Sequence, residues 1–338
     1  MQNLDRKRPI DNKRESGGTA QVGDNLDGAI VEMTEVNGRL YVIKERSIYE
    51  MITADDIDPE RTNISIPNYI PKLVIDQGSE SVMVSRTFLT AKNLFKTEYI
   101  ETIIDFGKVQ KLSVEIVQEL SILDKEIREY LEQEKNEIAH FEERQMQDKP
   151  FSLPSIINLE STCKTIFQKA DHVEQVLMEI IVEFYPNEGL TKQSHFPIFY
   201  DVLQRLYGVE DNFSEFVMKT LDIMKIIREL RNGLDHRLKT TDVRNFEFLP
   251  SSEILLPTIE LDSKNARMKK SFLSQILPII EKNLISIIEV TFTYLTEKHL
   301  KKDIFGYQVR EIPIEKRKYK FVNYCVWSQF GKEGFYNQ

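Results

Sequence analysis

The stretch of the chain richest in reactive side chains is RELRNGLDHRLK, residues 228–239. It follows the mostly apolar stretch FVMKTLDIMKII, and within it Asn232 and His236 are four residues apart, with Arg231 directly before Asn232. Side chains four residues apart lie on one face of a helix, and the long Arg231 side chain reaches that face. A histidine can act as base or acid near neutral pH, and an arginine offers permanent charge and paired donors to phosphate oxygens. These residue types suit chemistry at a phosphate group.

The apolar pattern predicts one continuous helix over residues 213–239. Its stripe runs straight through Asn232-Gly233 and consists of Ile223, Ile227, Leu230, Leu234 and Leu238. An Asn-Gly pair is also typical of a helix end, but a helix that ended there would not need Leu234 and Leu238 in register. Inside a helix, Gly233 costs about 1 kcal/mol relative to Ala, so we expect it to let another backbone come close.

Two interpretations of the polar segment follow from the residues alone. In the first, a helix end meets water, and Arg228 and Arg231 form surface pairs with Glu229 and Asp235. In the second, one face of a buried helix opens into a cation, an amide and an imidazole that form a reaction centre. A single helix supplies only one histidine, which can act as an acid or as a base but not as both at once.

The motif Arg231-Asn232-x-x-x-His236 resembles the R-x4–6-H motif of HEPN domains (higher eukaryotes and prokaryotes nucleotide-binding domains). In that family the residue after the arginine is often Asn, Asp or His. The resemblance covers about residues 155–302 and implies an all-α up-down bundle with the motif on a late helix. The run of expected helices before the motif, and one more long helix after it, agree with that order.

The resemblance implies a metal-independent endoribonuclease that acts in antiviral defence or as a toxin. Arg231, Asn232 and His236 would be catalytic, and we assign Arg228 and Arg237 to substrate binding. It also implies a homodimer in which two motifs face one cleft, an RNA substrate, and no metal or cofactor. An antitoxin or sensor would bind through the N-terminal region. The alternatives are a non-catalytic HEPN module that binds nucleotide, RNA or a protein partner, and a helical protein in which the motif is incidental.

The elements that must position this motif divide the chain into five expected segments, with an α+β fold overall. The C-terminal side is expected to be a mainly α-helical HEPN-like bundle, preceded by a small β-containing domain and a long connecting helix. Asn37-Gly38 lies between AIVEMTEV and RLYVIKER, which predicts a hairpin in the small domain. The segments are a flexible tail (1–27), a small α+β domain (28–105), a long amphipathic helix (106–150), the helical domain (151–302) and a strand-rich extension (303–338).

Within the helical domain, the spacing of apolar residues predicts four helices and one interruption. The helices are expected at residues 157–185, 197–207, 213–239 and 265–302, and a β-hairpin or extended excursion at 246–263. The long amphipathic helix, about 110–145, is either a coiled-coil arm or a bridge between domains. In the tail, the cluster Arg6-Lys7-Arg8 with Lys13-Arg14 is either a localisation or nucleic-acid arm or, as we favour, a solvated segment.

Composition narrows the class of protein. The 338 residues are 29% charged and 41% hydrophobic, with a net charge of −9, which argues against a bulk grip on nucleic acid but not against a local basic groove. Cys163 and Cys325 are too few for a disulfide framework or zinc site, so we expect a reducing cytoplasm. We expect no secretory signal and no membrane span, because the longest apolar run contains Glu281, Lys282 and Glu289.

Competing motifs are weak. The sequence has no nucleotide-binding glycine loop, no H-E-x-x-H and no G-x-S-x-G. We interpret the remaining histidines as surface or packing residues: His140, His172, His195 and His299. The acidic turn with Asp55, Asp56 and Asp58 could bind a cation, but a solvated turn is the simpler interpretation.

Overall fold

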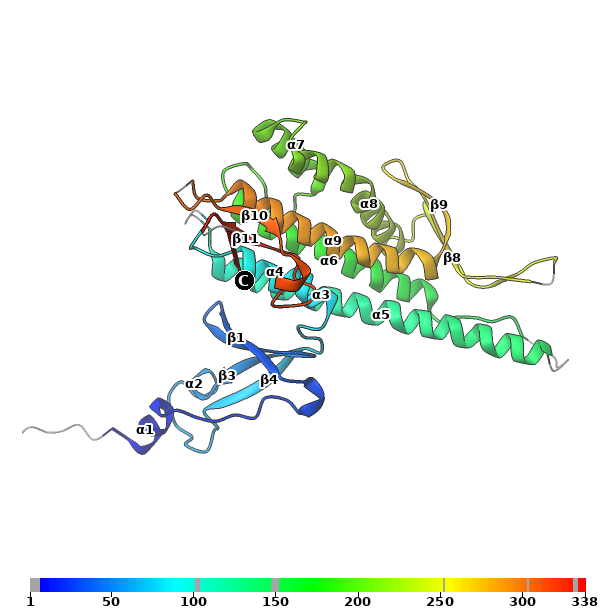
Figure 1. The fold of residues 1–338 in the computed structure, drawn as a ribbon. Helices are drawn as coiled ribbons and strands as arrows, with labels where there is room; N and C mark the ends of the chain where they lie inside the picture. The colour runs from blue at the N-terminus through cyan, green and yellow to red at the C-terminus, as the bar shows by residue number, and fades with distance from the viewer. Residues whose placement is uncertain (1–6, 101–103, 147–151, 252, 303, 331–333) are drawn as a thin grey trace, which may run out of the picture.

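A computed structural model describes residues 7–100, 104–146, 152–251, 253–302, 304–330 and 334–338, and in it the chain has a mixed α+β fold (Figure 1). Long helices form a bundle, a four-stranded sheet lies at its N-terminal side, and shorter strands lie at both ends of the bundle. The expected α+β fold class is confirmed at this level.

The N-terminal sheet is an antiparallel meander in the order β1-β2-β3-β4. Its strands are β1 (Ile30–Val36), β2 (Arg39–Lys44), β3 (Ile48–Thr53) and β4 (Tyr69–Ile75). Asn37 and Gly38 both have positive φ, 49° and 77°, as a two-residue turn between right-twisted strands requires. The hairpin predicted from Asn37-Gly38 is therefore confirmed.

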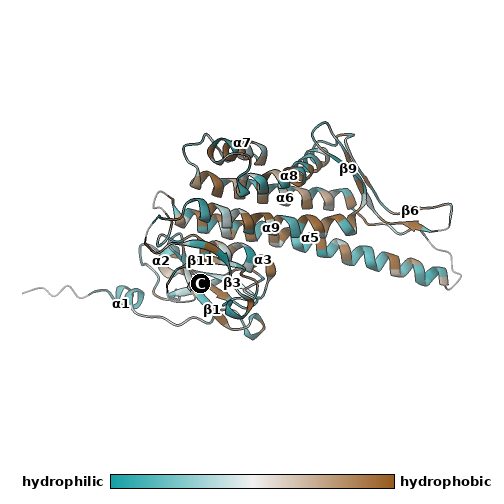
Figure 2. Ribbon diagram, turned by 45° about the horizontal axis from the view of Figure 1, so that its top comes forward, coloured by the Kyte–Doolittle hydropathy of each residue, from teal (hydrophilic) through white to brown (hydrophobic). Residues whose placement is uncertain are grey.

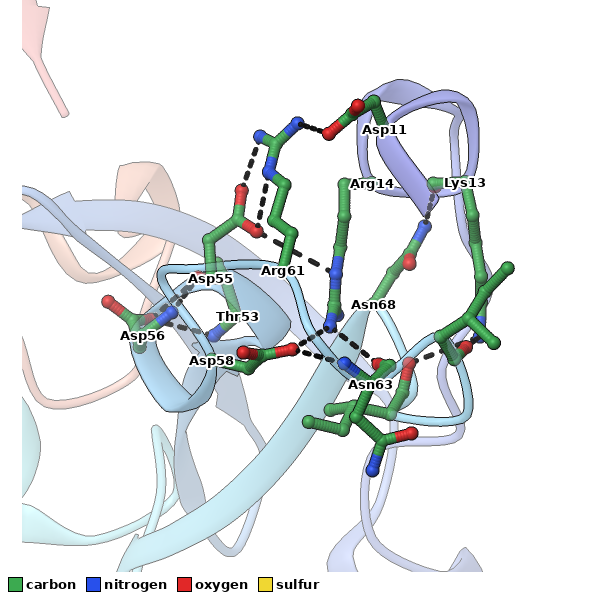
Figure 3. Close-up of polar contacts among 12 residues, drawn as sticks. Asp11, Lys13, Arg14, Thr53, Asp55, Asp56, Asp58, Arg61, Asn63 and Asn68 are labelled. Carbon is green, nitrogen blue, oxygen red and sulfur yellow. Dashed lines mark hydrogen bonds and ion pairs between the residues drawn. The ribbon is translucent and has the colours of Figure 1, made fainter. Parts of the chain in front are cut away.

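Part of the expected flexible tail is structured. Residues Pro9–Glu15 form helix α1, which is followed by the short 3-10 helix η1 (Asn25–Asp27). Figure 3 shows how α1 is held: the Lys13 ammonium donates to the Ile66 carbonyl at 3.1 Å, and the buried Arg14 guanidinium lies 3.5 Å from Asp58. Lys13 and Arg14 are thus contacts within the fold and not part of a solvated basic arm; Arg6 lies outside the described residues.

The acidic turn after β3 is occupied by protein contacts. Asp56 and Thr53 form a reciprocal cap at the start of the short helix α2 (Ala54–Ile57). Asp55 pairs with Arg61 at 2.8 Å, and Asp58 accepts the backbone N–H of Asn63 at 2.8 Å (Figure 3). These carboxylates act as helix caps and ion-pair partners, in line with the interpretation of a turn.

All five helices that the pattern predicts are present; four of them form the bundle, and the shorter α7 packs against its α8 end. The bounds are α5 (Phe106–Met146), α6 (Leu159–Phe184), α7 (Phe196–Tyr207), α8 (Asn212–Asp235) and α9 (Leu273–Lys298). Helix α5 packs along α6 and also contacts α9, so its first half belongs to the shared core. Figure 2 shows apolar residues where these helices lie together and a largely hydrophilic far end of α5.

A short, nearly continuous helical segment connects the sheet to α5. It consists of α3 (Val82–Val84), the π-helical segment η2 (Ser85–Leu89) and α4 (Thr90–Leu94). Its side chains are almost all buried against α5 and α9.

The expected helix start at residue 265 is wrong. Residues Arg267–Phe272 form strand β9, which pairs with β8 (Thr258–Asp262), and β8 pairs on its other side with β5 (Thr241–Arg244). Buried Ile259 and Leu261 anchor this sheet against the bundle, and α9 begins only after β9 ends. The excursion predicted at 246–263 is present as well, as the small hairpin of β6 (Glu247–Phe248) and β7 (Ile254–Leu255) followed by β8.

Two of the C-terminal strands contact α4 and α9. They are β10 (Gln308–Glu311), β11 (Tyr324–Ser328) and β12 (Phe335–Asn337), with the 3-10 helix η3 (Ile314–Lys316) between the first two. One hydrophobic core runs from Val36 to Val326, so the four expected segments after residue 27 share a core. In the part of the chain that the structure describes, no helix is both long and apolar enough to cross a membrane.

Candidate functional site

Helix α8 continues through Gly233 but ends at Asp235, four residues before the expected end. The His236 N–H bonds to the Asn232 carbonyl at 3.0 Å, and the Leu238 N–H bonds to the Gly233 carbonyl at 2.8 Å. With Arg237 at φ 49°, these bonds form the left-handed turn that commonly closes a helix. Leu238, expected to extend the buried stripe, is 46% exposed. His236 therefore lies on a helix-terminating turn and not on a helical face.

Gly233 permits a close approach, as the sequence predicts, although the approaching group is a side chain. A Cβ atom at position 233 would lie 2.0 Å from Thr241 Oγ1 and 2.7 Å from Thr241 Cβ. The chain therefore reverses after α8 and places the first residue of β5 against the helix. This contact fixes the direction in which the turn at His236 leaves the bundle.

Arg228 forms an ion pair with a buried carboxylate of α6. Its Nη2 lies 2.7 Å from Glu174 Oε1, and Glu174 is fully buried. The same oxygen accepts the backbone N–H of Phe196 at 3.3 Å, at the start of α7. Since a buried charge needs a partner, this pair holds three helices in register. The Arg228 guanidinium is mostly buried and paired with Glu174, which argues against its predicted role in substrate binding.

Arg231 lies among carboxylates but keeps part of its guanidinium open. Its Nε is 3.1 Å from Asp235 and 3.7 Å from the buried Asp171 of α6, and its Nη1 donates to Asn232 Oδ1 at 2.9 Å. The Nε contacts are ion pairs without hydrogen-bond alignment. Within the described residues, Nη2 has no hydrogen bond, and the side chain is 30% exposed. The side chains of Arg231 and Asn232 thus contact each other, and Arg231 keeps N–H donors that have no hydrogen bond within the described residues.

The carboxylates around Arg231 differ in their electrostatics. Burial, followed by the negative charge of Glu174, raises the pKa of Asp171 above its usual 3.8 despite Arg231. Burial opposes ionisation of Asp235 too, but hydrogen bonds from Lys164 and Gln168 and the charge of Arg231 lower its pKa. Asp235 is therefore the firm counter-ion of Arg231, and Asp171 is the weaker one.

His236 and Arg237 extend into solvent beyond this network. Both are exposed, and within the described residues neither side chain has a hydrogen bond or ion pair. His236 follows Asn232 by one helical turn through the backbone bond between them. Of the predicted site residues, Arg228 and Arg231 contact carboxylates of α6, Asn232 contacts Arg231, and His236 and Arg237 lie at the exposed turn.

Sequence reasoning missed the partners on α6. Glu174 occupies the apolar stripe of that helix, three or four residues from buried Ala170 and Leu177. A carboxylate on a buried stripe needs a cation as its partner. The position of Glu174 on the stripe is therefore the signal that could have indicated pairing with the arginines of α8. The other missed partners are Lys164, Gln168 and Asp171.

The remaining histidines have packing or surface environments. His299 stacks edge-on against Phe184 and Tyr185, and His195 begins α7 beside Glu174, with 3.6 Å between Nδ1 and Oε1. His140 is exposed on α5, and His172 lies 3.5 Å from Glu119. These positions agree with the interpretation from sequence.

No protein-family model matches the chain, and no curated protein or solved structure is significantly similar to it. Among the described residues, no group of three or more His, Cys, Asp and Glu side chains is placed to hold a metal ion. The geometry at the end of α8 therefore has to be judged on its own chemistry.

Proposed function

We propose that this chain is a metal-independent endoribonuclease of the HEPN type, acting in antiviral defence or as a toxin, with an active site shared by two copies. The observation that carries the proposal is the end of α8. There an exposed imidazole, His236, lies five residues after Arg231, which is held by ion pairs yet keeps donors open. The motif also lies on the last bundle helix but one, with the long α9 after it.

Metal-independent cleavage of RNA needs few groups other than these. A base removes the proton of the ribose 2′-hydroxyl, the 2′-oxygen attacks phosphorus, and the bond to the 5′-oxygen breaks as an acid protonates that oxygen. A neutral and a protonated imidazole can fill the two roles. The open Nη2 of Arg231 would donate to the phosphate oxygens, where negative charge accumulates. Arg237, exposed beside His236, is the better placed cation for a neighbouring phosphate.

A second copy of the chain would supply the second imidazole. One protomer presents one histidine at this turn, and the turn is exposed, so two turns can face each other across a two-fold axis. Cytoplasmic action fits the two cysteines, which are free and buried. The N-terminal sheet is our candidate for docking an antitoxin or sensor, since several of its apolar side chains are exposed: Ile30, Met33, Leu40 and Leu73.

A second function is favoured by a separate observation. Arg228 and Arg231 both have carboxylate partners on α6 or α8, so a structural role alone would explain their presence. Under this alternative the domain is a non-catalytic HEPN module that binds nucleotide, RNA or a protein partner. His236 decides between the two, because its side chain has no structural partner among the described residues.

The experiment measures cleavage of labelled RNA in excess EDTA by the wild type, His236→Ala and His140→Ala. His140 is an exposed histidine on α5 and serves as the matched control. We expect at least a hundredfold loss for His236→Ala, of the size typical for removal of an acid or base, and no loss for His140→Ala. RNA binding without cleavage by the wild type would support the non-catalytic alternative.

Mixed dimers test the shared site. Wild type and His236→Ala are co-expressed in varied ratios, and activity per total protein is measured. A site that needs both imidazoles gives activity that falls with the square of the wild-type fraction. A linear fall would mean that each protomer acts alone.

A further inference from the structure

A lysine-lined pocket lies at the opposite end of the bundle from the tip of α8. It has a volume of about 100 Å³ and forms where α4, strand β1 and the C-terminal segment meet. Figure 1 shows α4 and β11 together on one side, whereas β8 and β9, next to the end of α8, lie on the other. Its lining residues are Glu32, Leu89, Lys92, Asn93, Lys96, Lys318, Tyr319, Val322 and Gln338.

The side chains of this pocket, called here the lysine pocket, do not balance in charge. Glu32 is the one carboxylate side chain that lines it, and it accepts hydrogen bonds from Lys92 and the Tyr319 hydroxyl. Lys318 lies 3.5 Å from the same carboxylate. Three ammonium groups against one carboxylate leave a net side-chain charge of +2.

Lys96 is the cation without a carboxylate. Within the described residues it has no hydrogen bond or ion pair, although it is partly buried. The nearest acidic residue along the chain, Glu98, is exposed and lies outside the pocket lining. Partly buried beside Lys92 and Lys318, an ammonium group without a carboxylate of its own leaves the pocket with surplus positive charge that can attract an anion.

A neutral acceptor nearby is also left without a partner. Asn93 is 8% exposed, and its Nδ2 donates to the Tyr324 carbonyl at 3.1 Å. Its Oδ1 is buried and has no hydrogen bond. A ligand that carries both negative oxygens and a hydroxyl or protonated oxygen would satisfy Lys96 and this amide together.

We propose that the lysine pocket binds the phosphate group of a small phosphorylated molecule. A phosphate carries about −1.5 to −2 charges at pH 7, which matches the surplus of the lining side chains. Lysines act as compact point charges and bind phosphate well. Its other lining side chains include the apolar Leu89 and Val322. The proposal is independent of the function proposed for α8.

The electrostatics of Lys96 agree with this. Burial lowers the pKa of Lys96 below its usual 10.5, and the charges of Lys92 and Lys318 lower it further, while Glu98 and Glu32 oppose the shift. A bound dianion would reverse the shift, so binding at alkaline pH should take up a proton.

The test is isothermal titration of the whole chain with inorganic phosphate and with AMP, at constant ionic strength in a non-phosphate buffer. We expect saturable binding at one site per chain. Tighter binding of AMP would identify a nucleotide as the source of the phosphate, and equal binding would identify free phosphate. No saturable binding of either probe overturns the proposal.

Two variants with opposite expected signs separate the pocket from general charge. Lys96→Gln should weaken phosphate binding about tenfold, because it removes one charged donor. Glu32→Gln should tighten it several-fold, because it removes the competing negative charge. The control is Lys269→Gln, an exposed lysine on β9, which should have no effect. Weakening by Glu32→Gln, or equal weakening by Lys96→Gln and Lys269→Gln, would overturn the proposal even if one variant folds poorly.

Discussion

The end of α8 and the lysine pocket contain the same kinds of charged side chain, but the two regions differ in their balance of charge. At the end of α8 three cations meet three carboxylates, namely Lys164, Arg228, Arg231, Asp171, Glu174 and Asp235. In the lysine pocket, three cationic side chains meet one carboxylate side chain. A balanced network fixes positions, whereas an unbalanced one attracts an anion. Any catalysis at α8 therefore depends on the few groups outside the network: His236 and the open side of Arg231.

The largest effect on stability is expected from breaking the balanced network. Glu174→Gln leaves the Arg228 guanidinium, 20% exposed, without its carboxylate. We expect a loss of about 3 kcal/mol in the free energy of unfolding, measured by urea denaturation, because an uncompensated buried charge remains.

Two further variants check the cause. Glu174→Gln with Arg228→Met should recover part of the loss, because the orphaned charge is gone. Glu215→Gln breaks an exposed pair with Lys219 one turn into α8 and should cost no more than about 0.5 kcal/mol. If the exposed and buried substitutions had equal costs, the α8 network would not be the stabilising feature described here.

A smaller loss is expected from Gly233→Ala. An alanine favours a helix by about 1 kcal/mol, but here its Cβ would overlap Thr241, and such overpacking costs about 1–3 kcal/mol. We expect a net loss of about 1 kcal/mol, with recovery when Thr241→Gly is added. A net gain in the single variant would show that β5 does not press on the helix.

The smallest effects are expected in the pH dependence of stability. Asp171 in the α8 network and Lys96 in the lysine pocket should change stability with pH in opposite directions. The pKa of Asp171 is raised in the fold, so the folded state holds its proton more tightly and stability falls as pH rises from 3.8 through the folded-state pKa. The pKa of Lys96 is lowered, so stability rises with pH between the folded-state pKa and 10.5.

Neutral substitutions should remove each dependence separately. Asp171→Asn should flatten the acid side of the stability profile and leave the alkaline side unchanged, and Lys96→Met should do the reverse. Chemical denaturation across pH in phosphate-free buffer measures both. An unchanged profile for either variant would contradict the environment described for that group.

Local sequence patterns predicted much of the fold. Asn37-Gly38 specified its hairpin because the turn needs positive φ at both positions, and the leucine and isoleucine spacing specified α5 and α6. The strand at Arg267–Phe272 was mistaken for helix because its pairing partner β8 decides its conformation, and no local pattern encodes that partner. Helix α1 was missed because distant acceptors such as Asp58 hold its cations.

Only part of the candidate site could be predicted from the sequence. Arg231, Asn232 and His236 were named from their spacing, but the place where α8 ends depends on Arg237 adopting a left-handed turn and on Thr241 closing against Gly233. The acidic partners Asp171 and Glu174 belong to another helix, and the lysine pocket joins residues separated by more than two hundred positions. Such groupings are created by tertiary packing.

The most direct measurement is the chemistry of the RNA ends produced in excess EDTA. Attack by the ribose 2′-oxygen leaves a 2′,3′-cyclic phosphate on one fragment and a 5′-hydroxyl on the other, and mass spectrometry identifies both. The account predicts these ends with the wild type and with His140→Ala, and uncut RNA with His236→Ala. Other ends, or the same ends at an equal rate from His236→Ala, would contradict it.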